Sequence, residues 1–414
     1  MNTNNSLSGA SDVRPKLSAL IQDMCPNGVE FKTLGEVLDY EQPTPYIVKN
    51  TDYDESYSTP VLTAGQSFIL GYTNEKEGIY KASKEQPTII FDDFTTSFHW
   101  VDFDFKVKSS AMKMLRPKND ANINFRFVFY AMQCIKFQAT EHTRYWISKY
   151  SQFEIPLPPL EIQKKIVECL DKFSALAAEL QAELQKRRTQ YEYYRTRLLT
   201  PPQTISPEGS TDDRNWTWKT LGEIGEMIKG SGIQKSDFVE EGRPCIHYGQ
   251  VHTYYGTFAY KNKSYISEEL YAKCKKAHTG DLVIATTSED VEACCKATAW
   301  LGKEDVAVSG DAHIYRHSQN PKYMAYLFQT EMFAQQKRKV ATGAKVTRVH
   351  GNDILKFRFP FPSLEEQARI VAILDKFEAL TTSLSDGIPA EQAAQQTRYE
   401  YYRDLLLTFP KAEK

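Results

Sequence analysis

Several features that would narrow the class of this protein are missing from its 414 residues. No apolar run approaches the roughly 18 residues of a membrane-spanning helix. The first residues, Met1-Asn-Thr-Asn-Asn-Ser6, carry no basic-then-apolar export signal. The seven cysteines are an odd number without a Cys-x-x-Cys pair, which is typical of reduced thiols. These absences predict a cytoplasmic protein without membrane contact.

Metal ligands are also missing as a pattern. The nearest approach to a cluster is a set of cysteines and histidines in the second half: Cys245, His247, Cys274, His278, Cys294 and Cys295. Their spacing matches no zinc site, so we expect small buried side chains there and no metal.

The common cofactor and catalytic motifs are absent as well. Gly302-Lys303 lacks the upstream glycine and the hydroxyl of a phosphate-binding loop, and there is no Gly-x-Gly-x-x-Gly. An adenine methyltransferase needs an Asn/Asp-Pro-Pro-aromatic tetrad, whose flanks both Pro-Pro pairs lack. The pair Asp92-Asp93 has no spaced lysine of a nuclease and is more typical of a turn or cap. We therefore expect a binding component with no catalytic residues.

Charge of one sign is not in excess. Lys and Arg number 51 and Asp and Glu 53, for a formal charge of −2, which gives no support to nucleic-acid binding. The distribution is more informative than the sum. Basic residues gather at Lys106, Lys108, Lys113, Arg116 and Lys118, and again at Lys337, Arg338, Lys339, Lys345 and Arg348.

What the sequence does contain is an internal repeat. Residues 156–176 return as 360–380, with 13 of 21 positions identical at a constant offset of 204. The stretches between repeats, roughly 38–150 and 225–355, share almost nothing. One frame thus surrounds two different inserts. Two shorter segments also return: Phe31-Lys-Thr-Leu-Gly-Glu-Val37 as Trp218-Lys-Thr-Leu-Gly-Glu-Ile224, and Tyr191-Glu-Tyr-Tyr-Arg195 as Tyr399-Glu-Tyr-Tyr-Arg403.

Each copy of the frame includes a long helix. Residues 160–199 place apolar side chains at steps of three and four without Gly or Pro, as in a coiled-coil seam. The second copy keeps this rhythm over 364–386, breaks at 386–389, and resumes from about 390 to 407. The expected seam residues are Ile166, Leu170, Phe173, Leu180, Leu184, Ile370, Leu374, Phe377 and Leu384.

A helix with one apolar seam needs a partner, and its own repeat is the nearest one. We expect the two arms to pack antiparallel, with the inserts at opposite ends about a pseudo-twofold axis. Two arms that bind separate partners are the alternative. The repeated tyrosines fit packing in this coil, and a docking surface that overlaps them is the second interpretation: Tyr191, Tyr194, Tyr399 and Tyr402.

The inserts have the pattern of mixed α/β domains. We expect strands at 87–91, 100–107 and 280–285, and short helices at 125–137 and 321–339. The predicted fold is two α/β domains separated by a long antiparallel two-helix coiled coil. The expected segments are an N-terminal segment (1–30), a first α/β domain (31–157), the first long helix (158–200), a linker (201–217), a second α/β domain (218–361), a second helical arm (362–408, broken at 386–389) and a C-terminal tail (409–414).

This arrangement resembles the specificity subunits of type I restriction–modification systems, closest to their IC group, over nearly the whole chain. Each insert is entered by Lys-Thr-Leu-Gly-Glu and left by Pro-x-Pro-x-Leu-Glu-x-Gln. The segments 25–36 and 387–391 look like frame motifs of that family. The inserts look like its target recognition domains, on the segments Val61–Asn74, Ile90–Thr96, Cys245–Gln250 and Gly280–Glu289.

The resemblance implies a division of labour. This chain would read a bipartite, asymmetric site on double-stranded DNA, one half per recognition domain. Two methyltransferase (modification) subunits would methylate adenine with S-adenosylmethionine, and restriction/translocase subunits would use ATP and magnesium. No cofactor would bind this chain. A two-headed protein-binding scaffold is the alternative, and an unrecognised enzyme site around Cys294, Cys295 and His313 is another.

The first long helix has a length that could set the distance between two half-sites on DNA. Its seam from Ile166 to Leu198 spans 32 residues, which is about 48 Å of helix or about 14 base pairs. Residues 177–180 and 181–184 are similar tetrapeptides, so deleting one is expected to shorten the tolerated spacer without changing the half-sites. Good helix-forming composition is the other explanation. Because the net charge is slightly negative, we expect the chain alone to bind DNA weakly.

Bases are read by long polar side chains on loops, Arg and Lys suiting guanine, Gln and Asn suiting adenine. For any one candidate, a solvated surface residue is the alternative. The candidates are Gln66, Tyr72, Asn74, Lys108 and Arg144 in the first insert, and His247, Gln250, Tyr255, Thr287, Lys345 and Arg348 in the second.

Overall fold

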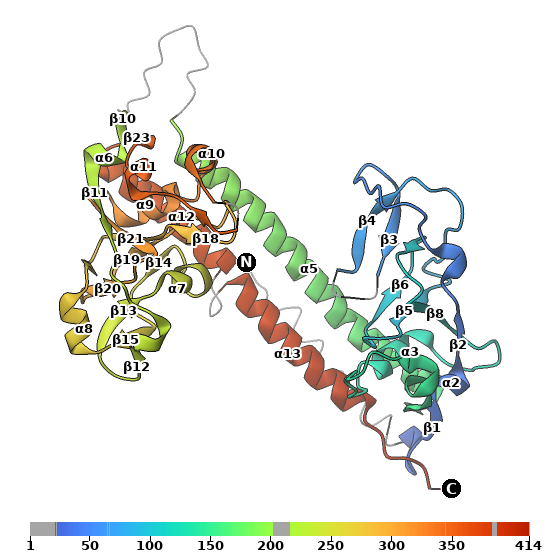
Figure 1. The fold of residues 1–414 in the computed structure, drawn as a ribbon. Coiled ribbons are helices and arrows are strands. Elements are labelled where there is room, and N and C mark those ends of the chain that lie inside the picture. Colours follow the sequence, from blue (N-terminus) through green and yellow to red (C-terminus); the bar gives the residue numbers. More distant parts are fainter. Residues whose placement is uncertain are drawn as a thin grey trace. The chain divides into compact units, whose positions relative to one another are not determined.

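A computed structural model of the chain describes residues 21–413, apart from residues 22, 64, 66, 202–215, 344 and 383–386. The chain forms two compact units (Figure 1): unit 1 is Met1–Leu180 with Gln392–Lys414, and unit 2 is Gln181–Glu391. Among the described residues, no helix combines the length and apolar character needed to cross a membrane. The expected linker 201–217 lies mostly outside the described residues.

Unit 1 contains a four-stranded sheet of order β2-β8-β5-β6, a three-stranded sheet of order β4-β3-β7 and the strand pair β1-β9. Its elements are β1 Glu30–Thr33, α2 Leu34–Val37, β2 Leu38–Glu41, η1 Thr44–Tyr46, β3 Thr59–Leu62, β4 Ile69–Thr73, β5 Thr88–Asp92, β6 Phe98–Val101, β7 Lys106–Val107, β8 Met112–Pro117, α3 Phe125–Met132, α4 Tyr145–Ser148, η2 Tyr150–Gln152 and β9 Glu154–Leu157, with parts of α5 Leu160–Leu198 and α13 Ile388–Leu407.

Unit 2 contains two five-stranded sheets, β11-β21-β17-β19-β14 and β12-β15-β13-β20-β16, and the pairs β10-β23 and β18-β22. Its elements are β10 Thr217–Thr220, α6 Leu221–Ile224, β11 Gly225–Lys229, η3 Lys235–Asp237, β12 Phe238–Val239, β13 Arg243–Ile246, α7 Tyr248–Thr253, β14 Phe258–Ala259, β15 Ser264–Ile266, α8 Glu268–Lys273, β16 Lys276–Ala277, β17 Leu282–Ala285, β18 Thr287–Ser288, β19 Lys296–Trp300, β20 Val306–Val308, β21 Ala312–His317, α9 Pro321–Leu327, α10 Glu331–Val340, β22 Thr347–Arg348, α11 Gly351–Ile354, β23 Arg358–Phe361 and α12 Leu364–Thr382.

The repeated Lys-Thr-Leu-Gly-Glu segment closes each insert. In unit 1 it forms β1, which pairs antiparallel with β9, and in unit 2 it forms β10, which pairs antiparallel with β23. Its glutamate then starts a one-turn helix by accepting the threonine backbone N–H, at 2.7 Å for Glu36 with Thr33 and 2.5 Å for Glu223 with Thr220. The two ends of each insert therefore meet at one short strand pair.

The central strand of each main sheet is buried on both faces. In β5, Ile89 and Phe91 enter one apolar cluster and Ile90 enters another. In β17, residues 282 and 284 enter one cluster and residues 283 and 285 another. A strand covered on both sides needs a continuous apolar run, which explains why these segments show no alternation.

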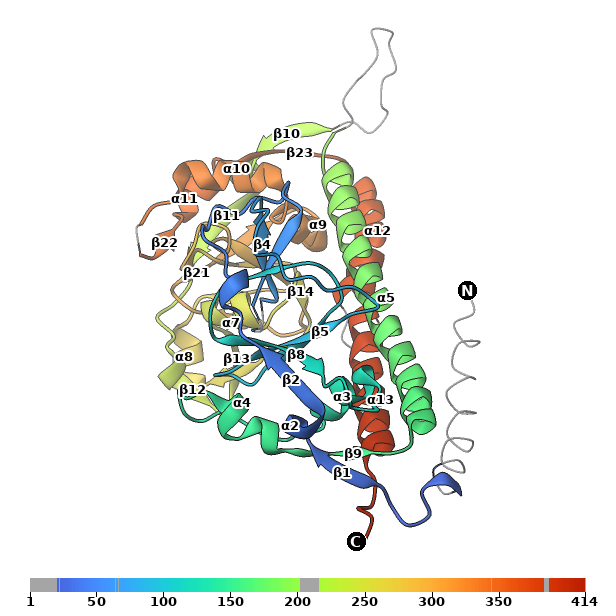
Figure 2. The ribbon, with the colours of Figure 1, turned by 90° about the vertical axis from the view of Figure 1, so that its right-hand side faces the viewer.

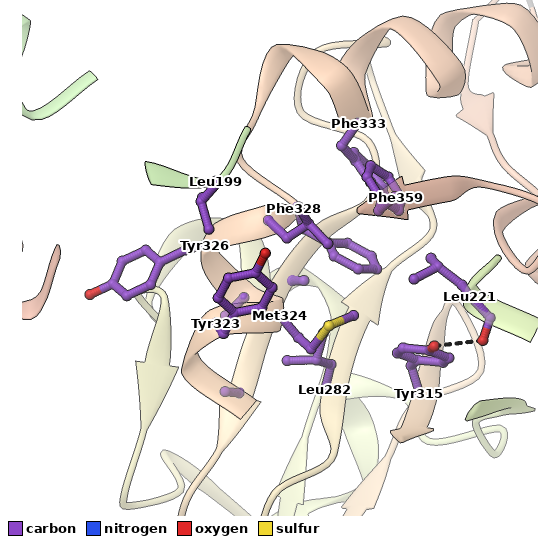
Figure 3. Packing of buried hydrophobic residues seen from close by; sticks show 14 of the residues in the cluster. Leu199, Leu221, Leu282, Tyr315, Tyr323, Met324, Tyr326, Phe328, Phe333 and Phe359 are labelled. Carbon is purple, nitrogen blue, oxygen red and sulfur yellow. Dashed lines mark hydrogen bonds between the residues drawn. The ribbon is translucent and has the colours of Figure 1, made fainter. Parts of the chain in front are cut away.

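The larger cluster of unit 2 packs α9 and α10 onto the main sheet. Leu282 lies beneath Met324 and Phe328, and Phe333 stacks near Phe359 (Figure 3). Tyr315 is fully buried, and its hydroxyl donates to the Leu221 carbonyl at 2.7 Å. This bond ties the sheet to the frame segment because Leu221 belongs to the repeated motif.

The frame is repeated down to single hydrogen bonds. Gln163 of α5 accepts the backbone N–H of Asn124 at 2.8 Å and donates to the carbonyl of Pro158 at 2.8 Å. These bonds fix the start of the long helix against the N-cap of α3, which lies beside α5 (Figure 2). In the second copy, Gln367 likewise accepts the backbone N–H of Asn320 at 3.0 Å and donates to the carbonyl of Pro362 at 3.0 Å.

A second repeated contact joins each long helix to the short helix before it. Asp171 accepts from Arg126 at 2.9 Å and from the Tyr130 hydroxyl at 2.5 Å. The sequence signal is Asn-x-Arg/Lys-x-x-x-Tyr at 124–130 and 320–326, which sequence reasoning overlooked. The second copy places Asp375 at 2.6 Å from Lys322 and 2.7 Å from the Tyr326 hydroxyl.

Both units pack part of α5 against the second arm. In unit 1, Phe173 stacks on Tyr402 of α13, with ring centroids 5.3 Å apart. In unit 2, Tyr194 stacks on Phe377 of α12, also at 5.3 Å. The partner number falls as the α5 number rises, as in an antiparallel pair, so the expected pairing of the two arms is confirmed.

The expected seam residues differ in burial. Leu384 lies outside the described residues. The others are buried or half-buried: Ile166, Leu170, Leu184, Ile370 and Leu374 are buried, and Phe173, Leu180 and Phe377 are half-buried.

Several expected elements are shorter than the sequence indicated. The strand expected at 100–107 is wrong, because β6 ends at Val101 and β7 begins at Lys106 in a different sheet. Apolar alternation continues across this crossing, but Phe103 is exposed and Lys106 is buried. The helix expected at 125–137 ends at Met132. The one expected at 321–339 divides in two, because Thr330 caps a new helix, α10.

Candidate nucleic-acid interface

The acidic pair after β5 is part of the fold. Asp92 Oδ1 accepts the backbone N–H groups of Phe94 and Thr95, both at 2.9 Å, which is the turn expected from the sequence. Asp93 is 1 % exposed, lies 3.3 Å from the Lys113 ammonium and accepts the Trp146 N–H at 2.8 Å. A buried carboxylate with these partners is a structural ion pair.

Burial removes three lysines from the basic clusters that the sequence suggested. Lys106 is 1 % exposed, donates to two backbone carbonyls and lies 3.1 Å from Glu75. Lys113 is paired with Asp93, and Lys337 is 4 % exposed and donates to two carbonyls. Sequence proximity therefore overstated the positive charge available to a ligand.

Three candidate base contacts of unit 1, Tyr72, Asn74 and Lys108, lie on or directly after β4 and β7. Gln66 falls outside the described residues. Tyr72 is half-buried within β4, and Asn74 is exposed just after it. Lys108 follows β7, is exposed and lies 5.7 Å from the centroid of the Tyr53 ring. Asn74 and Lys108 therefore remain available to a partner.

Three candidates of unit 2 have side chains that already contact other parts of the fold. His247 is 8 % exposed and caps α7, and burial lowers the pKa of its imidazole. Gln250 accepts the His247 N–H at 3.1 Å and donates to Ser264 at 2.6 Å. Tyr255 is 3 % exposed, and its hydroxyl accepts a backbone N–H at 2.8 Å.

The remaining candidates of unit 2 come together on one ribbon. In β18 and β22, Thr287 lies opposite Arg348. Thr287 is 9 % exposed, and its carbonyl contacts the His252 ring nitrogen at 2.9 Å, which joins this strand pair to α7. Arg348 and Lys345 are exposed on the turn that the Thr342–Arg348 bridge closes. The ribbon thus presents two cations.

Arg144 and Arg348 share a relation that sequence reasoning overlooked. Both follow a threonine, and they stand 204 residues apart, the offset of the frame. The next residue in each case donates its backbone N–H to the first residue after the central strand. The bonds are Tyr145 to Asp93 (2.8 Å) and Val349 to Thr286 (3.1 Å).

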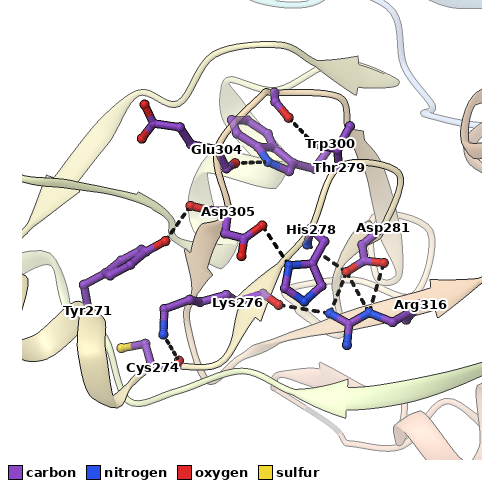
Figure 4. Close-up of polar contacts among 11 residues, drawn as sticks. Tyr271, Cys274, Lys276, His278, Thr279, Asp281, Trp300, Glu304, Asp305 and Arg316 are labelled. Atoms are coloured by element: carbon purple, nitrogen blue, oxygen red, sulfur yellow. Dashed lines mark hydrogen bonds and ion pairs between the residues drawn. The ribbon is translucent and has the colours of Figure 1, made fainter.

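The cysteines and histidines do not converge. Cys294 and Cys295 are each 1 % exposed, and the His278 ring faces the Asp305 carboxylate at 2.7 Å (Figure 4). The His313 ring contacts the Thr286 hydroxyl at 3.0 Å, and burial lowers its pKa. In the part of the chain that is described, no three His, Cys, Asp or Glu side chains are placed to hold a metal ion.

The repeated Tyr-Glu-Tyr-Tyr segments place their tyrosines differently. Tyr191 is buried, and the Tyr399 hydroxyl donates to the side chain of Gln133. The middle tyrosine, which sequence reasoning did not single out, is exposed in both copies: Tyr193 by 55 % and Tyr401 by 56 %. Equal exposure of one aromatic in both copies favours a repeated docking surface over packing for that position.

Comparisons with known proteins agree with this architecture. The family model for the type I restriction modification DNA specificity domain matches residues 26–187 and again residues 213–392. The chain is 42 % identical over 404 residues to the EcoR124I/EcoR124II type I restriction enzyme specificity subunit of Escherichia coli, covering 93 % of this chain and 95 % of that one. It is 30 % identical over 400 residues to a putative type I specificity subunit of Haemophilus influenzae, covering 92 % and 96 %.

Solved structures share the fold at low sequence identity. The S subunit of a type I restriction–modification system from M. genitalium superposes with a TM-score of 0.54 at 14 % identity, covering 92 % of this chain and 96 % of that one. A chain from a study of type I system assembly and conformational transition gives 0.56 at 18 %, covering 92 % and 98 %.

Proposed function

Because the chain belongs to the type I restriction modification DNA specificity family, we propose that it is the non-catalytic DNA-recognition subunit of a type I restriction–modification complex. Each unit reads one half of a bipartite, asymmetric site. The observation that carries this proposal is the frame repeated around two unlike inserts, down to the bonds of Gln163 and Gln367. The relatives give no support to the protein-binding scaffold.

The partners follow from the repeat and the family. Two modification subunits dock one per copy of the frame, and the exposed Tyr193 and Tyr401 belong to the docking surfaces. S-adenosylmethionine, ATP and magnesium act on the partner subunits, which carry the catalytic work in this proposal. Restriction/translocase subunits join such a complex in the cytoplasm.

The test is adenine methylation mapping in a methylation-free host that co-expresses this chain with its modification subunit. We expect one split motif with a methylated adenine in each half. No new methylation, from a complex shown to assemble, would overturn the proposal.

A finer proposal is that α5 sets the distance between the half-sites. The helix runs for 39 residues without a break. Deleting residues 177–180 should shorten the preferred spacer and leave both half-sites unchanged. A changed half-site with the original spacer would contradict this proposal, and replacing the same four residues with alanines is the matched control for altered composition.

A further inference from the structure

Two arginines hold the same place in two inserts that otherwise differ. Arg144 and Arg348 each precede the residue whose N–H bonds to the carbonyl directly after the central strand. The carbonyl belongs to Asp93 in unit 1 and to Thr286 in unit 2, so the backbone position is shared although the side chains there are not. The frame therefore extends to these arginines.

Neither arginine is needed to fill a core. The Arg144 side chain is 50 % exposed, lies 3.6 Å from Asp93 and stands 5.7 Å from the centroid of the Phe94 ring. The Arg348 side chain is exposed, and the described residues offer its guanidinium no hydrogen bond or ion pair. Asp93 already has Lys113 as its buried partner, at 3.3 Å.

We propose that Arg144 and Arg348 make the same contact in both half-sites, each binding a phosphate of the DNA backbone. This rests on the proposed function. The two inserts read different bases, so a residue that they share at one backbone position suits what the half-sites share, which is the sugar–phosphate chain. A guanidinium presents a planar fork of donors that matches phosphate geometry.

Neighbouring cations do not share this relation. Lys345 is exposed three residues before Arg348, but the residue 204 positions earlier is Glu141. A cation present in one insert alone suits a contact that differs between the half-sites. Lys345 is therefore the matched comparison for Arg348, on the same turn and with the same charge.

The experiment uses the full chain in complex with its modification subunits. Binding is measured as a function of salt on the mapped site and on a duplex with both half-sites scrambled, for Arg144→Ala and Arg348→Ala. Each variant should bind both duplexes roughly tenfold more weakly. The slope of log affinity against log salt should fall by about 1, and the methylated motif should be unchanged. Arg→Lys at either position should restore the slope.

Controls separate this contact from general charge and from folding. Lys84→Ala in unit 1 and Lys273→Ala in unit 2 remove exposed lysines that lie far from the arginines in sequence and should leave the slope as it is. Lys345→Ala should relax the motif in one half-site. Relaxed base preference in Arg144→Ala or Arg348→Ala, or lost affinity with an unchanged slope, would overturn the phosphate assignment. Absence of any specific motif with the unaltered chain would instead overturn the proposed function.

Discussion

Unit 1 and unit 2 make the same backbone hydrogen bond after their central strands but place different side chains there. Where the central strand ends, both need a residue whose carbonyl receives the N–H of the segment leading to the exit strand. Unit 1 places Asp93 there and neutralises it with the buried Lys113, whereas unit 2 places Thr286 there and bonds it to His313. The backbone bond belongs to the frame and the side-chain chemistry to the insert.

The largest expected loss of stability follows from removing the buried carboxylate of unit 1. Asp93→Ala leaves the buried Lys113 without its partner, which should lower the free energy of unfolding by about 3–5 kcal/mol. Thr286→Val at the corresponding position of unit 2 removes a neutral hydrogen bond and should cost about 1 kcal/mol. Denaturant unfolding of the full chain, followed by two probes because the chain has two units, measures both.

The double variant Asp93→Leu with Lys113→Met is the control for the ion pair. It removes both charges and should recover most of the loss, since a buried pair replaced by apolar groups is often near neutral. Equal costs for Asp93→Ala and Thr286→Val would show that the backbone bond alone matters.

A pH effect on stability is expected from a half-buried histidine of unit 2. Burial lowers the pKa of His317 to about 4, while an unfolded histidine titrates near 6.5. The unfolded chain takes up the proton at a higher pH than the folded chain does. The contribution of His317 to stability is therefore complete above pH 6.5 and is lost as the pH falls toward 4, by up to about 3 kcal/mol.

The corresponding sheet position of unit 1 is Pro117, which does not titrate. His317→Gln should reduce the pH dependence of the unfolding transition of unit 2, while the shifted His247 and His313 keep their share of it. An unchanged pH profile in this variant would locate the titration elsewhere.

Smaller losses of stability, equal in the two units, are expected where both copies of the frame make the same side-chain contacts. Asp171→Asn in unit 1 and Asp375→Asn in unit 2 each weaken a contact to a cation and to a tyrosine hydroxyl. Both carboxylates are partly exposed, so the expected cost is about 1.5 kcal/mol in each case. Thermal unfolding measures it, and a large inequality between the variants would contradict equivalence of the two copies.

The smallest effect on stability is expected at the exposed tyrosines. Tyr193→Ala and Tyr401→Ala should change the free energy of unfolding by less than about 0.5 kcal/mol. Each should reduce the number of modification subunits bound from two to one, as measured by light scattering or native mass spectrometry. Two bound subunits in both variants would exclude these residues from docking, and Glu192→Ala is a matched exposed control.

Periodicity and repetition predicted the frame well, and the inserts less so. The helix expected at 160–199 agrees with α5 to within a residue, because its apolar spacing persists without a break. The alternation at 100–107 misled because it continues where the chain passes between sheets. The sequence suggested that Tyr255 and Lys106 are available to a ligand, but both are buried. The polar atom of each is hydrogen-bonded to a backbone group of another segment, which the neighbouring sequence does not reveal. Extending the 204-residue offset backward would have found Arg144 and Arg348 as a pair.

The tail of the chain completes the unit that the chain begins. Val29 and Lys411 form a parallel bridge, the Val29 N–H donates to the Pro410 carbonyl at 2.9 Å, and Lys411 pairs with Glu154. Unit 2, in contrast, is a single contiguous stretch, residues 181–391. During synthesis, domains usually fold from the N-terminus onward. In this chain we expect unit 2 to be complete before unit 1. All residues of unit 2 are synthesised before residue 392, whereas the apolar face that α13 covers in unit 1 stays open until residues beyond 392 have been made. Nascent unit 1 is therefore the part expected to need a chaperone.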